Sequence, residues 1–147
     1  MTFPQPVFEA ARVLTSETRR ETLIRLSQAT PRFLQGVYPF AGRGIFDLAP
    51  LHDDLAYRVP EGYVAEIVYL RAGNASDDLI CLALTVYDRP SRYFPLGPKS
   101  DSHVELAIVE SHAAGTRIAV CFAAPRGVSG AVVVDVGMLE IHGGARS

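Results

Sequence analysis

Residues 79–87, with the sequence LICLALTVY, form the longest nearly uncharged apolar segment of the chain. In an extended chain Ile80, Leu82, Leu84 and Val86 share one face, because successive side chains of a strand point to opposite sides. The segment has less than half of the roughly 20 residues that a transmembrane helix needs. We therefore interpret it as a buried β-strand of a globular domain.

The chain from Gly44 onward continues in the same way, with short apolar segments separated by turn residues. This spacing is typical of an all-β sandwich or barrel. The sequence predicts an antiparallel, jelly-roll-like β-sandwich of about eight strands. We expect these strands at 44–48, 55–59, 63–72, 79–88, 92–96, 103–110, 116–124 and 131–141.

Turn residues and side-chain alternation give further detail. The segments 59–63 (VPEGY) and 89–92 (RPSR) contain the Pro and Gly that favour tight turns between strands. In the last strand the apolar residues shift to Leu139 and Ile141, so we expect a β-bulge or a bend beside Gly137.

Residues 1–43 differ from the predicted sandwich domain at 44–147. Ser16 can cap a helix that begins at Glu17 and that Pro31 ends. The aromatic segment that follows, as far as Gly44, has neither helical nor strand periodicity. We expect this arm either to pack across its own sandwich or to reach a neighbouring subunit, since exposed apolar segments often mark association surfaces.

Composition excludes several classes of function. The chain has 147 residues and a formal net charge of −2, which describes one globular domain with no broad attraction to nucleic acid or to anionic membranes. The beginning of the sequence does not resemble a signal peptide, so we expect a cytoplasmic protein. Cys81 and Cys121 lie in apolar strand segments, where a thiol behaves as a small hydrophobic group.

A predicted hairpin carries the first candidate binding site. Arginine offers a planar fork for carboxylate or phosphate, and exposed aromatic rings can stack on a sugar or a nucleobase. A sheet edge protected by cations and proline would have the same composition, and both interpretations stay open. The candidate ligand-binding residues are Arg89, Arg92, Tyr93, Phe94 and Lys99.

A second candidate is a divalent metal site at His103 and Glu105, with His52 as a further ligand. Gly97, His103, Glu105 and Glu110 partly resemble the first metal motif of the cupins, in which two His and a Glu bind a divalent cation inside a jelly roll. Glu105 stands where the motif has its second His. The alternatives are an outward-facing His–Glu pair at residues 103 and 105, and a solvated loop at His52 and its two following aspartates.

The stretch from Tyr57 to Asn74, the following residues 76–79 and the ending 134–141 resemble carbohydrate-binding modules of the galactose-binding-like type. The resemblance covers about residues 55–141 and implies a jelly-roll fold. It places Asp135 where the family has a calcium-linked acid, and it carries over no sugar-contacting residue, because this chain has no Trp. A divalent metal is compatible with it, although we expect no cofactor.

The sequence contains no Gly-x-Ser-x-Gly, Walker, dinucleotide-binding, His-Glu-x-x-His or Cys-x-x-Cys motif. We therefore expect a non-catalytic ligand-binding or assembly protein that forms a homo-oligomer and takes a small molecule or a carbohydrate. The alternatives are a metal-dependent cupin-like enzyme that uses His103 and Glu105, and a carbohydrate-binding module.

Overall fold

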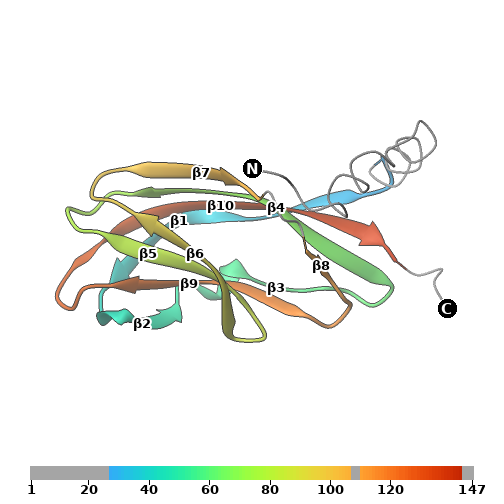
Figure 1. Ribbon diagram of the computed structural model, residues 1–147, viewed down its shortest axis with the longest axis horizontal. Helices are drawn as coiled ribbons and strands as arrows, with labels where there is room; N and C mark the ends of the chain where they lie inside the picture. Colours follow the sequence, from blue (N-terminus) through green and yellow to red (C-terminus); the bar gives the residue numbers. More distant parts are fainter. Residues whose placement is uncertain (1–26, 107–109, 144–147) are drawn as a thin grey trace, which may run out of the picture.

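Two antiparallel sheets pack face to face and share one core, as the alternating strands predict. A computed structural model describes residues 27–106 and 110–143. We call the two sheets sheet A and sheet B; in Figure 1 the strands of sheet A lie above those of sheet B. The predicted all-β sandwich is confirmed.

Sheet A has the strand order β1-β10-β4-β7, and the short strand β8 also pairs with β4. Its strands are β1 (Thr30–Ala41), β4 (Tyr63–Asn74), β7 (Asp101–Glu105), β8 (Ser111–His112) and β10 (Ser129–His142). Sheet B has the order β2-β9-β5-β6, and β3 pairs with β9. Its strands are β2 (Gly44–Pro50), β3 (Ala56–Arg58), β5 (Ile80–Val86), β6 (Arg89–Leu96) and β9 (Arg117–Ala124), and the 3-10 turn η1 (Asp53–Leu55) joins β2 to β3.

The strands pair in a nested order, as they do when one long hairpin is rolled into two sheets. Apart from the short strands β3 and β8, the first strand pairs with the last, β2 with β9, β4 with β7, and β5 with β6. This arrangement is the strand order of a jelly roll. Among the described residues no helix is long and apolar enough to cross a membrane.

Side-chain alternation puts the predicted residues into the core. Leu82, Leu84 and Val120 are at most 1% exposed. On β7, His103 and Glu105 are exposed, whereas Val104 between them packs against the core. The predicted faces of these strands are therefore correct.

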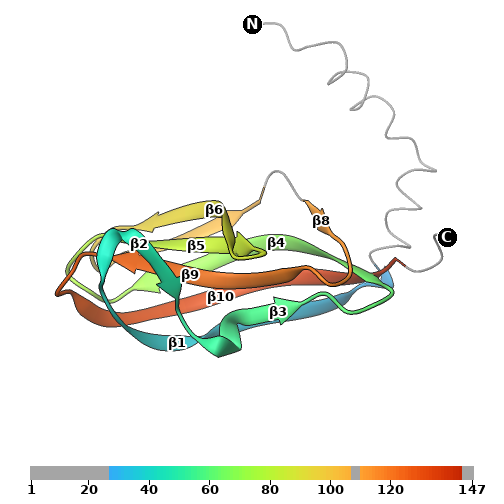
Figure 2. The ribbon, with the colours of Figure 1, turned by 90° about the horizontal axis from the view of Figure 1, so that it is seen from below.

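The proline-containing arm is a regular strand, and the expectation that it lacks strand structure was wrong. β1 pairs with β10 in one unbroken register over its whole length and runs along one side of the molecule (Figure 2). Pro31, Gly36 and Pro39 interrupt the sequence pattern without interrupting this ladder, so the sandwich begins before residue 44. The helix expected from Glu17 lies almost entirely outside the described residues.

The irregularity predicted beside Gly137 is confirmed, but the extra residue belongs to β4. Gly137 pairs with Tyr69 and Met138 pairs with Ile67, which leaves Val68 without a partner in β10. β4 therefore changes faces at Val68, while β10 keeps its alternation.

Because β10 keeps its alternation, Glu140 points into the sandwich. Glu140 is 4% exposed, whereas Leu139 is only partly buried. The expected shift of the apolar face to Leu139 was therefore wrong, although Ile141 is buried at 3% exposure.

The turn expected at Arg89–Arg92 lies earlier in the chain. Tyr87 and Asp88 have φ angles of 52° and 64° and connect β5 to β6, and β6 already begins at Arg89. Two successive positive φ angles are typical of a type I′ hairpin turn, which usually contains Asn or Gly. The turn here contains neither; Asp88 is the only residue of a type that tolerates positive φ, so the sequence signal for this turn is weak.

Glu140 connects the two sheets at one end of the sandwich. Tyr57 of β3 donates a hydrogen bond to one carboxylate oxygen, and Arg32 of β1 donates to the other at 3.2 Å. Burial alone raises the pKa of Glu140, but the hydrogen bonds from Tyr57 and Arg32 and the charge of Arg32 outweigh it. The pKa therefore lies below its ordinary value of 4.5.

We predict that Leu84→Ala lowers the free energy of unfolding by about 2–5 kcal/mol, because it leaves a cavity in a closely packed core. Leu79→Ala is the matched control: Leu79 is 50% exposed, and its truncation is expected to change stability by less than about 0.5 kcal/mol. Urea unfolding measures both variants, and equal losses would contradict the assigned strand faces.

We predict that Glu140→Gln lowers the free energy of unfolding at neutral pH by about 1.5–3 kcal/mol, the range for hydrogen bonds to a charged group. The folded-state pKa is lowered, so the stabilisation is complete above the ordinary pKa and is lost as the pH falls through the folded-state value. Unfolding curves of both proteins should therefore converge toward acid pH. A difference independent of pH would show that the charge of Glu140 contributes nothing.

Candidate functional site

A groove of about 700 Å³ crosses the outer face of sheet A. All four main strands of this sheet contribute to it, and they lie side by side in Figure 1. Residues 35–37 come from β1, 71–73 from β4, 101–103 from β7 and 133–135 from β10. The site thus consists of strands, which hold side chains more rigidly than loops do.

The register of the strands arranges the outward side chains in rows across the sheet. In the central row Gln35 pairs with Asp135, Asp135 with Arg71, and Arg71 with His103. Directly opposite side chains lie about 4.5–5.5 Å apart at their Cβ atoms. Four residues that are far apart in the sequence therefore form one continuous polar row.

Two further rows flank the polar row. One contains Val37, Val133, Gly73 and Asp101, and the other contains Phe33, Gly137, Tyr69 and Glu105. Val37 is 67% exposed, and Val133 and Phe33 are each 50% exposed. Gly73 has no side chain, so it leaves open space in its row between Val133 and Asp101.

Asp135 is the centre of the hydrogen bonding in the groove. Arg71 donates to Oδ2 of Asp135 through Nε at 3.2 Å and Nη2 at 2.6 Å, and Tyr69 donates to Oδ1 at 3.1 Å. The hydrogen bonds to Asp135 and its charge raise the pKa of Arg71. Burial, followed by the hydrogen bond to Asp135, raises the pKa of Tyr69, so its hydroxyl stays protonated as a donor.

The Tyr69 ring lies across Gly137 of the neighbouring strand. A Cβ atom at position 137 would be 2.0 Å from Cε2 of Tyr69, so only glycine leaves room for the ring. The Arg71 guanidinium lies 5.6 Å from the ring centroid, and the His103 ring meets it edge-on at 5.9 Å. Tyr69 therefore links the polar side chains of β4, β7 and β10.

The predicted hairpin residues do not form one site. Phe94 is 6% exposed and belongs to the core, so its prediction as a ligand-contacting residue was wrong. Tyr93 is 60% exposed, and Arg92 forms an ion pair with Glu110 at 3.1 Å. Arg89 is exposed at the start of β6, whereas Lys99 follows the end of this strand. At about 3.3 Å per residue, the two cations lie more than about 20 Å apart along β6.

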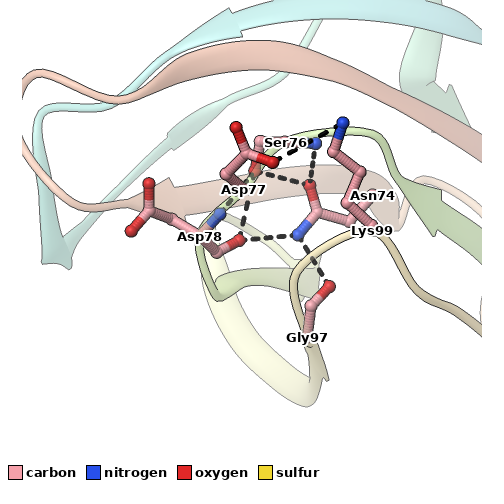
Figure 3. Close-up of polar contacts among 6 residues, drawn as sticks. All are labelled: Asn74, Ser76, Asp77, Asp78, Gly97 and Lys99. Carbon is pink, nitrogen blue, oxygen red and sulfur yellow. Dashed lines mark hydrogen bonds and ion pairs between the residues drawn. The ribbon is translucent and has the colours of Figure 1, made fainter.

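Lys99 belongs instead to a network of loops at the end of the sandwich, shown in Figure 3. Its Nζ lies 3.5 Å from Asp77, and its backbone N–H donates to the carbonyl oxygen of Ser76 at 2.9 Å. The side-chain nitrogen of Asn74 donates to the carbonyl oxygens of Asp78 at 2.8 Å and Gly97 at 3.0 Å. These bonds fix the strand ends that carry Gly73 and Asp101 at one end of the groove.

The proposed metal ligands are also separated. His103 and Glu105 share the outer face of β7, whereas the His52 ring packs against Tyr38 of β1 with a centroid separation of 4.7 Å. β1 and β7 are three strands apart in sheet A, which corresponds to about 14 Å. The described part of the chain contains no group of three His, Cys, Asp or Glu side chains that could hold a metal ion.

Sequence reasoning missed most of the groove. His103 was singled out as a metal ligand and Asp135 as a calcium-linked acid, but the structure places both in the polar row with Gln35 and Arg71. Both oxygens of Asp135 accept hydrogen bonds from protein groups. The sequence does show polar residues at outward positions of several strands. Only the register between the strands shows that these residues lie side by side.

No protein-family model matches the sequence, and no curated protein matches it. Among solved structures, the fold is similar to the CBM36-1 domain of a multidomain xylanase from the hindgut metagenome of Trinervitermes trinervoides. The similarity covers 75% of this chain and 96% of that domain, with 11% sequence identity and a TM-score of 0.44. A likeness of this degree carries no argument about function.

We predict that Gly137→Ala destabilises the protein by about 1–3 kcal/mol, because the new methyl group overlaps the Tyr69 ring. Gly73→Ala is the matched control on the same face, since a Cβ atom there meets no atom closer than 3.9 Å. Thermal and urea unfolding measure both variants. Equal stabilities would mean that the ring does not need the space above Gly137.

Proposed function

We propose that this protein is a non-catalytic binding protein whose groove on sheet A takes a neutral carbohydrate. The observation that carries the proposal is the row of Gln35, Asp135, Arg71 and His103 beside exposed apolar side chains. This row combines hydrogen-bond donors and acceptors on planar groups, which suit the hydroxyl groups of a sugar.

The charge of the row favours a neutral ligand. Arg71 and Asp135 form an ion pair at 2.6 Å, so the arginine is already compensated. An anionic ligand would have to compete with Asp135 for Arg71, and Asp101 at the end of the groove would repel it. A polyhydroxylated, uncharged molecule avoids both costs.

The apolar part of the groove favours a ligand with C–H faces. Val37 and Val133 are largely exposed in the row next to Arg71, and the Tyr69 ring lies in the row on its other side. Binding sites for small molecules combine apolar surface with a few well-placed polar groups. A sugar ring presents both kinds of surface at once, which distinguishes it from a purely polar ion or a purely apolar lipid.

The proposal is tested by filling the groove. Gly73→Val places a β-branched side chain on its floor, and a Cβ atom there makes only ordinary contacts at 3.9 Å. We expect the wild type to bind at least one neutral polysaccharide in affinity electrophoresis and on a glycan array, and the variant to lose this binding with an unchanged melting temperature.

Tyr93→Ala is the control variant, because Tyr93 is 60% exposed on sheet B and belongs to the predicted hairpin site. It should bind as the wild type does. Binding that Gly73→Val leaves intact would place the site elsewhere, and loss of binding in Tyr93→Ala alone would favour the hairpin. A wild type that binds no neutral polysaccharide in either assay would contradict the proposal.

A further inference from the structure

The free edge of β1 is the longest unpaired sheet edge with exposed apolar residues in the described chain. β1 is 12 residues long, lies at the end of the strand order of sheet A, and pairs only with β10. Phe33 and Val37 on this strand are 50% and 67% exposed. An edge of this kind is a template for pairing with another strand.

The alternation of β1 determines which backbone groups face its free edge. Gly42, just beyond the strand, donates its N–H to the carbonyl oxygen of Val128 at 2.6 Å, and the two residues continue the register of β1 with β10. The backbone groups of even-numbered residues of β1 therefore bond to β10, and the N–H and C=O groups of odd-numbered residues point away from β10, toward the free edge. The hydroxyl of Tyr38 donates to the carbonyl oxygen of Gln35 at 3.4 Å, which agrees with an outward Gln35 carbonyl.

Two prolines divide this edge. Pro31 and Pro39 are both odd-numbered, so the missing N–H of each faces outward and costs the ladder with β10 nothing. Between them, Phe33, Gln35 and Val37 present outward N–H and C=O groups. We call these residues, 33–37, the edge window; Gln35 is its midpoint and the midpoint between the two prolines.

We propose that the edge window pairs with the same window of a second copy of this chain, antiparallel about a twofold axis at Gln35. Gln35 then exchanges backbone hydrogen bonds with Gln35 of the partner subunit, and Phe33 exchanges them with Val37 of the partner subunit. Sheet A continues from one copy into the other. Pro31 lies opposite Pro39 of the partner subunit. Neither residue has an N–H to donate, so the hydrogen bonds between the two copies end before this pair.

Side chains and charge favour a second copy as the partner. This register places exposed Phe33 against the partner's Val37, and amide against amide at the centre, so the window is complementary to itself. Arg32 is the one charged residue of β1, and its side chain is paired with Glu140 at 3.2 Å. No like charges therefore meet at the seam.

The opposite edge of sheet A explains why pairing stops at two copies. That edge is β7, whose exposed residues are Asp101, His103 and Glu105. Charged side chains protect an edge strand from pairing. Sheet A of each copy thus has one edge suited to pairing, so pairing through sheet A gives a closed dimer and not a filament. The window is short compared with a standard interface, so we expect a concentration-dependent dimer.

Gln35→Pro tests the pairing, since it removes the central outward N–H at a position where the ladder with β10 uses none. Gln35→Ala is the matched control, because it removes the same side chain and keeps the N–H. Sedimentation equilibrium of the full chain over micromolar to millimolar concentration should show wild type and Gln35→Ala moving from the monomer mass of 15.9 kDa toward twice that mass. Gln35→Pro should weaken the dimer about tenfold or more, with an unchanged circular dichroism spectrum.

A wild type that stays monomeric, or a dimer that Gln35→Pro leaves unchanged, overturns the proposal. If Gln35→Pro does not fold, Phe33→Glu is the second variant, since it puts a charge in the seam at a half-exposed position; an unweakened dimer in this variant also overturns the proposal. The readout is mass and not ligand binding, so the outcome is independent of the carbohydrate proposal.

Discussion

One residue without a partner in β10, Val68, determines which side chains of β4 lie on the outer face of sheet A. Before it, Ala65 and Ile67 point into the core; after it, Leu70 and Ala72 do so. An uninterrupted strand with Ala65 and Ile67 buried would also turn Tyr69 and Arg71 inward, at the cost of burying a guanidinium. The carbonyl oxygen of Val68 accepts the N–H of Leu106 at 2.9 Å, so the bulge leaves this group bonded. Every polar contact of the groove on β4 depends on this change of face.

The position of Tyr69 also depends on Gly137, the residue opposite it in β10. The bulge brings Tyr69 opposite Gly137, where the ring has room to lie over the glycine and place its hydroxyl 3.1 Å from Asp135. Asp135 in turn holds Arg71. Because β10 itself keeps its alternation, the same strand presents Asp135 outside and Glu140 inside, and one strand supports both the groove and the contact between the sheets.

Most strands were predictable because their residues alternate between apolar and polar. β5, β7 and β9 bury the residues that alternation selects. The failures have local physical causes. In β1, the prolines and Gly36 mask the sequence pattern of a strand that pairs regularly. The turn at Tyr87 and Asp88 adopts positive φ without glycine. The change of face suggested by Leu139 occurs on the partner strand, at Val68. A single strand read alone cannot reveal which member of a pair carries the extra residue.

The candidate site was less predictable than the fold, because it exists only through pairing. Gln35, Arg71, His103 and Asp135 belong to four strands, and nothing in their own segments relates them. Neighbouring rows lie about 7 Å apart along the strands and neighbouring side chains about 5 Å apart across them. Such a lattice is fixed before a ligand arrives, so little conformational entropy is lost on binding. The residues that line the groove all belong to strands, whereas some catalytic sites have mobile loops that close over the substrate and expel water. A rigid, open and charge-compensated row is therefore in keeping with the proposal that the groove holds a neutral molecule.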